Sequence, residues 1–577
     1  MATTADLSVA IVRGDAARAL LLDSHFVQLW QKLYEQCPWA TGFQSPSFVL
    51  AWYRSYDFYE PLLILGRDRH QNLVGFFTLA RSEGELVVAG ARQAEYHTWI
   101  TLPDVGSAFM LAAYPQIQSV LGRTPLVLQY LPPGVPLDWI DRGSRHIPCR
   151  LEGVPRPLMR LVTGDMEDPF KKKNNKSKLN RLAKLGEVRF ERVTTRSDLE
   201  NVLEQITLFY DLRQAAIGAG TPFRSDPRKR EFHLALAEAP ALLHVTVLRA
   251  GDRLVGAHLG VASGSVVHLG ILTHSPFLAQ HSPGKLHLMF LAHSMTQSGY
   301  TTFDLTPGAD PWKERFANDR DTVNRLTVYR TFAGLKRAEY EEVLAGVARS
   351  MVRAVGLQPT RVREVVDATR RKGLLNALAH AAGAARRHAF EKTELRAYRM
   401  SLPGMIAGTL GDRAERDTIS SLLKFEEAAG TPTVERFFQA AVTRLEDGCH
   451  VYCRVEDGRL IHWGWFAPQQ ERSFLDEVHQ DLIFPEGSGT LFDFYTHPDY
   501  RRRGYYERSL REMIEDAMSA GVKQLYIFVR ADNVASRRAI EKVGFAYEFS
   551  LFEQKRWTKV TRWRVPDKSG APAPSDA

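Results

Sequence analysis

The stretch THPDYRRRGYYERSL, residues 496–510, has the composition of an anion-binding turn. It follows a β-pattern at 490–496 and precedes a helical pattern that starts near Tyr505. The first turn of a helix presents backbone N–H groups without helical partners, and the helix dipole adds positive potential. Gly504 lets the backbone approach a ligand closely. Three arginines add charge: Arg501, Arg502 and Arg503. The stretch predicts a phosphate cradle, because nucleic-acid surfaces more often disperse basic and aromatic residues over a face.

A second stretch, DNVASRRAIEKVGF at 532–545, predicts a helix that follows the adjacent strand of the sheet. It begins with Asp-Asn cap chemistry and ends at Gly544, in the position of a C-cap. Strand and helix patterns alternate from about residue 490 to this helix, which indicates a mixed sheet covered by helices.

In this order and spacing the two stretches resemble two motifs of the GNAT N-acetyltransferase superfamily. HPDYRRRGYY resembles its acyl-CoA-binding turn, Arg/Gln-x-x-Gly-x-Gly/Ala, and NVASRRAIEKVGF resembles its later Asn-x-x-Ser/Ala…Lys-x-Gly-Phe helix. The resemblance covers residues 396–565 and implies that acetyl-CoA or another acyl-CoA binds there as co-substrate. The cofactor-binding residues that it implies are Tyr495, Thr496, Arg501, Arg502, Arg503, Gly504, Tyr505, Tyr506, Asn533 and Ser536.

The same resemblance implies a catalytic group on the strand before the turn. Asp493 matches an acidic position of the family's strand motif, where it acts as general base or serves only as a structural acid. Ile540 stands where many members carry the tyrosine that protonates the departing thiolate. The tyrosines available to replace that acid are Tyr495, Tyr505, Tyr506 and Tyr547, and the last alternative is that no residue replaces it.

Three segments share the pattern of strand, polar turn and strand: 61–81, 242–262 and 449–469. Gly251-Asp252 and Asp457-Gly458 have the chemistry of hairpin turns. Each segment follows a helical pattern, so the three hairpins predict three related modules.

Segments of the first two modules resemble, in order, the cellulose-biosynthesis (CelD-type) acetyltransferase domain, a paired GNAT fold related to the Fem peptidyltransferases. They are GFQSPSFVLAWYRSY (42–56), KKKNNKSKLNRLAKLGEVRFERV (171–193) and HSPGKLHLMFLAHSMTQSGYTTFDLTPGADPWKERF (281–316). EYHTWI (95–100) departs from the Asp-Tyr pattern expected there, which favours a scaffold role for the first half.

In the second half, SPGKL again predicts a turn that opens a helix, with Lys285 adding positive charge. Asp304 ends the next predicted strand, and we take Asp304 and Lys285 as candidate substrate-binding residues. Lys313 follows a Pro-Gly-Ala-Asp-Pro turn, where the family position implies that it neutralises an oxyanion or a phosphate; the alternative is a surface lysine that caps a helix. The candidate catalytic residues are therefore Asp493, Tyr505, Tyr506 and Lys313.

The predicted fold class is α/β (α+β), with three GNAT-like mixed-sheet modules, the first two paired and joined to the third by a helical connector. The predicted domains are a first half at 1–160, a second half at 161–345, a basic helical connector at 346–395, the acyl-CoA-binding domain at 396–565 and a disordered tail at 566–577. The connector is expected to be solvated, with a membrane-surface helix over 361–390 as the alternative.

Composition narrows the classes of function. The 577 residues contain 44% hydrophobic and 24% charged residues and carry a net charge of +9, which suits anionic ligands without establishing nucleic-acid binding. No apolar run reaches the length of a membrane span. The four cysteines form neither a disulfide framework nor a complete metal site, so we expect a cytoplasmic protein without a bound metal.

The sequence thus predicts an acyl-CoA-dependent N- or O-acyltransferase, an enzyme of EC class 2.3.1. The family resemblance points the acceptor towards a sugar or polysaccharide precursor. Two alternatives stay open: a Fem-like transferase that uses aminoacyl-tRNA, which the basic helix at 171–184 would support, and a non-catalytic CoA sensor or scaffold, which Ile540 would permit. The oligomeric state is not predicted.

Overall fold

The computed structural model describes residues 7–142, 146–161, 172–308, 310–354, 390–402, 413–428, 431–556 and 559–566. The chain forms two compact units. The N-terminal unit comprises Met1–Gln214 and Ala219–Gly346, and the C-terminal unit comprises Ala215–Gly218 and Val347–Ala577. Nearly all of the predicted membrane-surface segment at 361–390 lies outside the described residues, as does the predicted tail from residue 567 onward.

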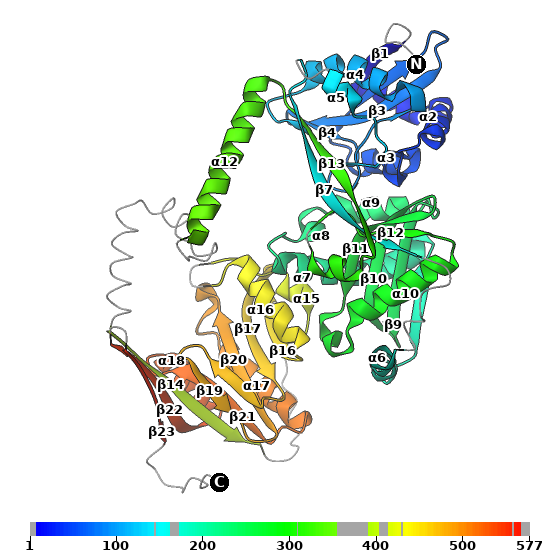
Figure 1. Ribbon diagram of the computed structural model, residues 1–577. Coiled ribbons are helices and arrows are strands. Elements are labelled where there is room, and N and C mark those ends of the chain that lie inside the picture. The colour runs from blue at the N-terminus through cyan, green and yellow to red at the C-terminus, as the bar shows by residue number, and fades with distance from the viewer. Residues whose placement is uncertain are drawn as a thin grey trace. The chain divides into compact units, whose positions relative to one another are not determined.

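The first sheet of the N-terminal unit contains five antiparallel strands (Figure 1). The hairpin predicted at 61–81 is confirmed as the pair β2–β3. The strands are β1 (Ser8–Arg13), β2 (Glu60–Arg67), β3 (Leu73–Ser82), β4 (Glu85–Val88) and β5 (Ile100–Thr101). The helices of this part are α1 (Gly14–Leu22), α2 (Ser24–Gln36), α3 (Pro46–Ser55), α4 (Gly106–Val120) and α5 (Asp138–Arg142).

The second sheet of this unit has eight strands in the order β6-β13-β7-β12-β11-β10-β9-β8. They are β6 (Leu126–Leu131), β7 (Cys149–Arg160), β8 (Val188–Val193), β9 (Leu243–Ala250), β10 (Arg253–Ser263), β11 (Val266–His274), β12 (Thr302–Asp304) and β13 (Asp319–Val328). Its helices are α6 (Lys173–Ala183), α7 (Arg196–Ala216), α8 (Pro222–Ser225), α9 (Arg228–Leu236), α10 (Pro283–Gln297) and α11 (Pro311–Phe316), and α12 (Phe332–Ala354) follows β13 and extends past Gly346, where the unit ends. The hairpin predicted at 242–262 is confirmed as β9–β10.

Two strands from the predicted first half of the N-terminal unit belong to the sheet of the second half. β6 and β7 belong by sequence to the predicted first half, 1–160, but both lie in the second sheet. β7 pairs with β13 from Cys149 to Leu158 and with β12 at its end, so both of its edges are used. Hydrogen-bonding partners, rather than order along the chain, therefore determine which sheet a strand completes.

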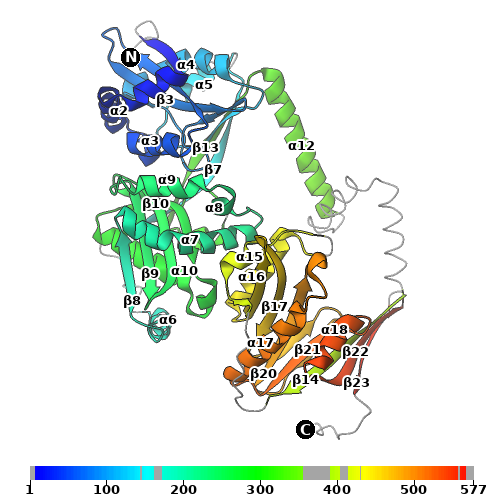
Figure 2. The ribbon, with the colours of Figure 1, turned by 180° about the vertical axis from the view of Figure 1, so that it is seen from behind.

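The C-terminal unit is built on one eight-stranded sheet in the order β15-β16-β17-β20-β21-β14-β22-β23. Its strands are β14 (Phe390–Ser401), β15 (Glu415–Arg416), β16 (His450–Glu456), β17 (Arg459–Ala467), β20 (Ser488–Thr496), β21 (Gln524–Arg530), β22 (Ala546–Arg556) and β23 (Lys559–Pro566), with a separate hairpin of β18 (Arg472–Leu475) and β19 (Gln480–Ile483). Both ribbon views show β14 between β21 and β22, although β14 comes first in the chain (Figures 1 and 2). The third predicted hairpin is confirmed as β16–β17.

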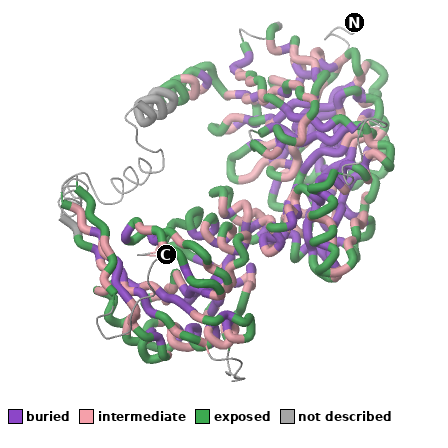
Figure 3. The backbone as a smooth tube through the Cα atoms, turned by 60° about the horizontal axis from the view of Figure 1, so that its bottom comes forward, coloured by how far each residue is buried: buried purple, intermediate pink, exposed green. Residues whose placement is uncertain are grey.

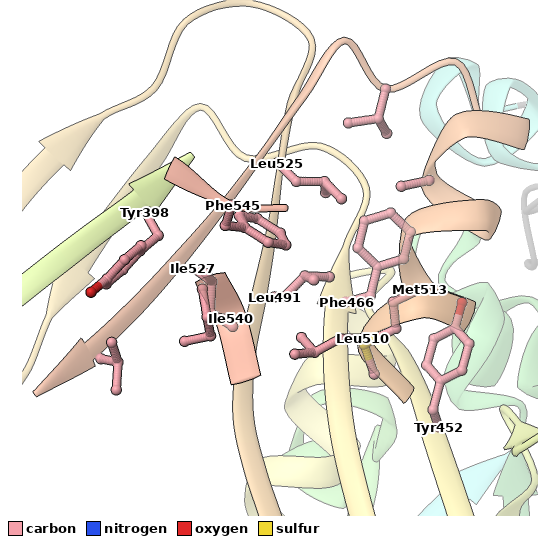
Figure 4. Close-up of a cluster of buried hydrophobic side chains, with 13 residues drawn as sticks. Tyr398, Tyr452, Phe466, Leu491, Leu510, Met513, Leu525, Ile527, Ile540 and Phe545 are labelled. Carbon is pink, nitrogen blue, oxygen red and sulfur yellow. The ribbon is translucent and has the colours of Figure 1, made fainter. Parts of the chain in front are cut away.

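Among the described residues, the helices that accompany this sheet are α15 (Ile419–Leu422), α16 (Val434–Glu446), α17 (Tyr505–Ser519) and α18 (Val534–Lys542). Leu510 and Met513 of α17 pack with Ile540 of α18 over Leu491 and Ile527 of the central strands (Figure 4). In both units the buried residues gather in the interior and the exposed ones lie outside (Figure 3). Burial of each large apolar side chain contributes about 1.5–3 kcal/mol, so this core fixes where α17 and α18 begin.

Candidate functional site

The two central strands of the C-terminal unit pair and then part. β20 and β21 run parallel, and their register extends only from Ser488↔Gln524 to Leu491↔Ile527. Beyond that point β20 stays with β17, with a shift of register between Trp463 and Trp465. The last residues of β20 therefore expose one backbone edge to the opening between the two strands.

A close contact across the sheet maintains this irregularity. A Cβ atom at Gly464 would lie 2.4 Å from the ring of Phe494, so only glycine leaves room for that ring. Asp493, beside Phe494, has a φ of +48°, an uncommon conformation for a residue other than glycine. The β-bulge turns the Phe494 ring towards α17 and the Asp493 carboxylate towards α16.

The predicted cradle is present as a turn that opens α17. The backbone is left-handed at Arg502 (φ +64°) and at Gly504 (φ +79°), and Gly504 is the N-cap residue. The first helical hydrogen bond runs from the N–H of Arg508 to the Gly504 carbonyl. Within the described residues, the backbone N–H groups from Arg503 to Glu507 have no acceptor. Consecutive free N–H groups at the positive end of a 15-residue helix form a favourable anion site.

The three arginines of the turn are not equivalent. Arg501 donates to the Thr496 carbonyl at 3.2 Å, and Arg503 lies 3.6 Å from the Glu456 carboxylate and over the Tyr500 ring. In the part of the chain that the structure describes, the guanidinium of Arg502 has no partner. Arg501 and Arg503 thus brace the turn, and Arg502 is the arginine available to a ligand.

The backbone N–H of Tyr506 belongs to the cradle, whereas its side chain packs against the core. Its ring packs edge-on against Phe494 with centroids 4.9 Å apart, and its hydroxyl accepts a hydrogen bond from Ser536 at 2.9 Å. Burial raises the pKa of Tyr506 to about 12. Asn533 caps α18 by accepting from the Ser536 N–H at 3.1 Å. These contacts join the first turns of α17 and α18, and the predicted contacts of Asn533 and Ser536 with a cofactor stay predictions.

The structure separates the candidate tyrosine acids by their partners. Ile540 is fully buried in the core, so its position offers no proton donor. The hydroxyl of Tyr505 bonds to Glu456 and that of Tyr547 to Ser550. The hydroxyl of Tyr495 is buried and has no partner among the described residues, while its ring stacks on Trp463 at 4.4 Å. Burial raises the pKa of Tyr495, which keeps the hydroxyl protonated at neutral pH.

Asp493 lies two residues before Tyr495 and forms an ion pair with Arg444 of α16. The guanidinium of Arg444 also lies over the rings of Trp465 and Phe492, at 5.1 and 5.2 Å. Both predicted roles of Asp493 stay open, because a base at this position would first have to leave Arg444. A cavity of about 610 Å³ adjoins the pair, and its lining includes Arg444, Asp447, Cys449, Gln469, Gln470 and Phe492.

The N-terminal unit repeats this arrangement. β11 and β12 run parallel from Val266↔Thr302 to His268↔Asp304, and the residue after Leu269, Gly270, is skipped in the register with β10. α10 follows with a left-handed N-cap residue, Ser282. Two lysines approach this turn, because Lys178 of α6 donates to the Ser282 hydroxyl at 2.6 Å and Lys285 donates to Asn175 at 2.9 Å.

The candidate residues of this unit are more deeply buried than the sequence indicates. Asp304 has no exposed surface and accepts hydrogen bonds from Tyr96, Arg156 and His268. Lys313 is also buried, and its ammonium group lies 3.3 Å from the Thr306 carbonyl and from Asp310, so it is not a surface lysine. The roles predicted for Asp304 and Lys313 towards a substrate stay predictions.

Sequence reasoning missed the contribution of the first predicted half. Tyr96, within the EYHTWI stretch, donates to Asp304 at 2.6 Å, so this stretch reaches the second sheet. Burial raises the pKa of its neighbour Glu95 to about 7, with Lys313 opposing the shift and Asp304 adding to it. The available signal was a glutamate beside a tyrosine in a stretch without hairpin or helix pattern.

The described part of the chain contains no cluster of histidine, cysteine or acidic residues suited to a metal ion. Nor is any helix in the described ranges long and apolar enough to cross a membrane.

Models of acetyltransferase families match one segment in each of the two units. Residues 170–314 match the model of an acetyltransferase (GNAT) domain, and residues 417–545 match that of the acetyltransferase (GNAT) family. An uncharacterized N-acetyltransferase of Bacillus subtilis (strain 168), YycN, is 29% identical over 92 residues, which cover 16% of this chain and 51% of the relative. The chain thus spans about half the length of the curated relative that it matches.

Similar solved structures include FemX and a tandem GNAT protein from the clavulanic acid biosynthesis pathway. FemX is 11% identical, with 54% of this chain and 98% of that chain covered and a TM-score of 0.39. The tandem protein is 12% identical, with 56% and 98% covered and a TM-score of 0.33.

Proposed function

From the premise that this chain carries two GNAT acetyltransferase domains, we propose that the C-terminal one transfers an acyl group from acyl-CoA to an amine or hydroxyl. The observation that carries the proposal is the run of free backbone N–H groups from Arg503 to Glu507, at the end of the opening between β20 and β21. A diphosphate fits such a run of donors, with Arg502 supplying further charge. The pantetheine amides would pair with the free edge of β20.

The residues on the α16 face of the sheet suit the chemical steps. The acceptor attacks the thioester carbonyl, a bond forms between its nitrogen or oxygen and the acyl carbon, and the carbon–sulfur bond breaks. Asp493 would take the proton of the acceptor once it leaves Arg444, and Tyr495 would protonate the departing thiolate. The raised pKa of Tyr495 favours this role, because the hydroxyl holds a proton to give.

We further propose that the acceptor is a polar molecule such as a sugar or polysaccharide precursor. The cavity of about 610 Å³ beside Arg444 has a size typical of small-molecule sites and is lined by charged and amide side chains. A panel of amino sugars, assayed by release of CoA thiol from acetyl-CoA, tests this class. Binding of CoA without thiol release for any acceptor would instead favour the alternative of a non-catalytic CoA sensor or scaffold.

Calorimetry with CoA tests the cradle itself. Gly504→Trp fills the N-terminus of α17, and a Cβ at Gly504 meets no atom within 4 Å, so the protein has room for the new side chain. Gly134→Trp is the matched control, because Gly134 also has a positive φ, +84°, and open space, and it lines neither this cavity nor the turn that opens α17. We expect Gly504→Trp to remove one equivalent of bound CoA and Gly134→Trp to remove none. Wild-type protein without binding heat, or an unchanged stoichiometry in Gly504→Trp, would refute the assignment.

A further inference from the structure

A small cavity of about 50 Å³ lies in the N-terminal unit where β11 leaves β12. Its wall is mostly apolar and includes Phe43, Phe48 and Phe232. Its titratable side chains are Glu95, His233 and His268. None of these was selected from the sequence, and the site proposed above does not use them.

His268 is held in one orientation. Its Nδ1 lies 2.9 Å from an Asp304 carboxylate oxygen, and its ring contacts those of Phe43 and Tyr96, with centroids at 5.5 and 5.2 Å. Burial opposes ionisation of Asp304, but the hydrogen bond from His268 and the charge of Arg156 outweigh it and hold the pKa of Asp304 below its usual value. An ionised carboxylate accepts a hydrogen from Nδ1, so in the neutral imidazole Nε2 is the nitrogen that carries the lone pair.

His268 differs from the other buried histidines of the described ranges that have an unpartnered ring nitrogen, because it borders the cavity. Its Nε2 atom is fully buried and lacks any hydrogen-bond partner within the described residues, although the side chain lines the cavity. A buried imidazole nitrogen without a partner is costly, and a ligand in the adjoining cavity would satisfy it. Asp304, fixed by the Tyr96 hydroxyl at 2.6 Å and the Thr306 N–H at 2.8 Å, holds the imidazole in place. An oriented histidine with a free Nε2 is the arrangement of a general base.

Glu95 provides the second free polar group of the cavity. Its carboxyl forms no hydrogen bond with any described residue, in contrast to the neighbouring Asp304. Nε2 of His268 and an ionised Glu95 are both acceptors, so they suit a molecule that brings several N–H donors. A primary amine meets this requirement, and a carboxylate does not.

The opening above the cavity suits an anionic acyl donor. β11 continues from His268 to His274 without pairing to β12 and leads to the α10 turn that Lys178 and Lys285 approach. Within the described residues, the N–H groups of Gly284 and Lys285 in that turn have no acceptor. The cavity and the α10 turn with its two lysines therefore both adjoin the part of β11 that follows its pairing with β12.

We propose that the N-terminal unit contains a second acyl-transfer centre, in which Nε2 of His268 accepts the proton of a primary amine as that amine attacks an acyl-CoA thioester. A carbon–nitrogen bond forms, the carbon–sulfur bond breaks, and the proton passes from the amine through His268 to the CoA thiolate. Asp304 is the positioning residue, and Glu95 pairs with the amine as it enters. This centre does not depend on the C-terminal site.

The test uses the full-length chain with Gly504→Trp, so that turnover at the C-terminal site is removed. Acetyl-CoA is the donor and hydroxylamine the amine probe, since it is small enough for the cavity, and acetohydroxamate formed above the uncatalysed rate is measured. We expect turnover in Gly504→Trp and a fall of about 10²–10⁴-fold when His268→Gln is added. Absence of turnover in Gly504→Trp overturns the proposal, whereas it leaves the CoA stoichiometry test of the C-terminal site unaffected.

His258→Gln is the matched control, because His258 is also fully buried, lies on the adjacent β10, has no partner for either ring nitrogen and is not part of the cavity wall. Equal rates in His268→Gln and His258→Gln would overturn the proposal. Glu95→Gln covers the case in which His268→Gln does not fold, because Glu95 has no hydrogen bond to lose. We expect Glu95→Gln to lower kcat/KM for hydroxylamine at least tenfold, and an unchanged value would also overturn the proposal.

Discussion

The two regions that match GNAT family models have the same backbone arrangement around their parallel strands but differ in the charged groups beside it. Each eight-stranded sheet contains one parallel pair, β11–β12 or β20–β21, that separates after three or four residues and leads to a helix with a left-handed N-cap residue. In the C-terminal unit the charges belong to the turn itself and are mostly exposed. In the N-terminal unit the charges beside the opening are buried, and they come from segments far apart in the sequence. The backbone arrangement that the two units have in common thus fixes where an acyl donor can lie. The side chains around it determine which groups can accept or donate protons.

The buried histidines give the largest expected difference between the units. Burial lowers the pKa of His233, His244, His274 and His287 to about 3 and that of His97 to about 4 in the N-terminal unit. In the described part of the C-terminal unit, His462 alone has such a pKa, also about 3. Because these values lie below the unfolded value of about 6.5, the unfolded chain binds more protons as pH falls.

We therefore expect acid to destabilise the N-terminal unit first. The stability is fully present above about pH 6.5 and falls by about 1.4 kcal/mol per pH unit for each such histidine as pH drops towards 3. Calorimetric unfolding of the full chain between pH 7 and pH 5 measures this, and Gly464→Ala identifies the transition of the C-terminal unit by shifting it. An equal fall in the unfolding temperatures of both units would show that the N-terminal unit is not the more acid-sensitive of the two.

The two key aspartates give the next difference. Asp304→Asn removes the buried carboxylate that accepts from Tyr96, Arg156 and His268, so we expect a loss of about 3–5 kcal/mol in the free energy of unfolding. Asp493→Asn breaks an ion pair whose aspartate side chain is 45% exposed, and we expect a loss below about 1 kcal/mol. Urea unfolding of both variants checks the contrast, and a loss in Asp304→Asn as small as in Asp493→Asn would contradict it.

The glycines opposite the two irregular strands sharpen the comparison further. A Cβ at Gly260 would lie 2.3 Å from the backbone carbonyl of His268, whereas a Cβ at Gly464 would meet the Phe494 ring at 2.4 Å. A ring can rotate and a paired backbone cannot, so Gly260→Ala should cost more than Gly464→Ala, within about 1–3 kcal/mol each. Thermal unfolding of the two variants measures the order, and the reverse order would be evidence against it.

The smallest effect concerns the one arginine of the C-terminal turn that has no partner among the described residues. Arg502→Gln should weaken CoA binding about fivefold, close to 1 kcal/mol, and less at high salt, because it removes a screened charge. Arg472→Gln, on the β18–β19 hairpin, makes the same change in net charge and serves as control. Equal affinities for CoA in the two variants would show that Arg502 does not contact CoA.

The sequence predicted what local patterns determine. The three hairpins, the turn that opens α17 and the helix at 534–542 follow from turn residues, glycines and caps, and the structure confirms them. It did not predict the cluster around Asp304, because Tyr96 lies 208 residues away and only the tertiary fold joins them. The side-chain direction of Tyr506 and the partners of the arginines depend on neighbours in the same way.

The position of β14 has a consequence for synthesis on the ribosome. β14 begins the C-terminal sheet at Phe390, yet its two neighbours are β21 and β22, which end at Arg530 and Arg556. At ordinary elongation rates, both edges of β14 wait on the order of ten seconds or more for their partners. During that interval the nascent strand presents unsatisfied N–H and C=O groups to other chains. A stop codon placed after β21 would leave the other edge of β14, which pairs with β22, exposed permanently, so β22 protects β14 from aggregation.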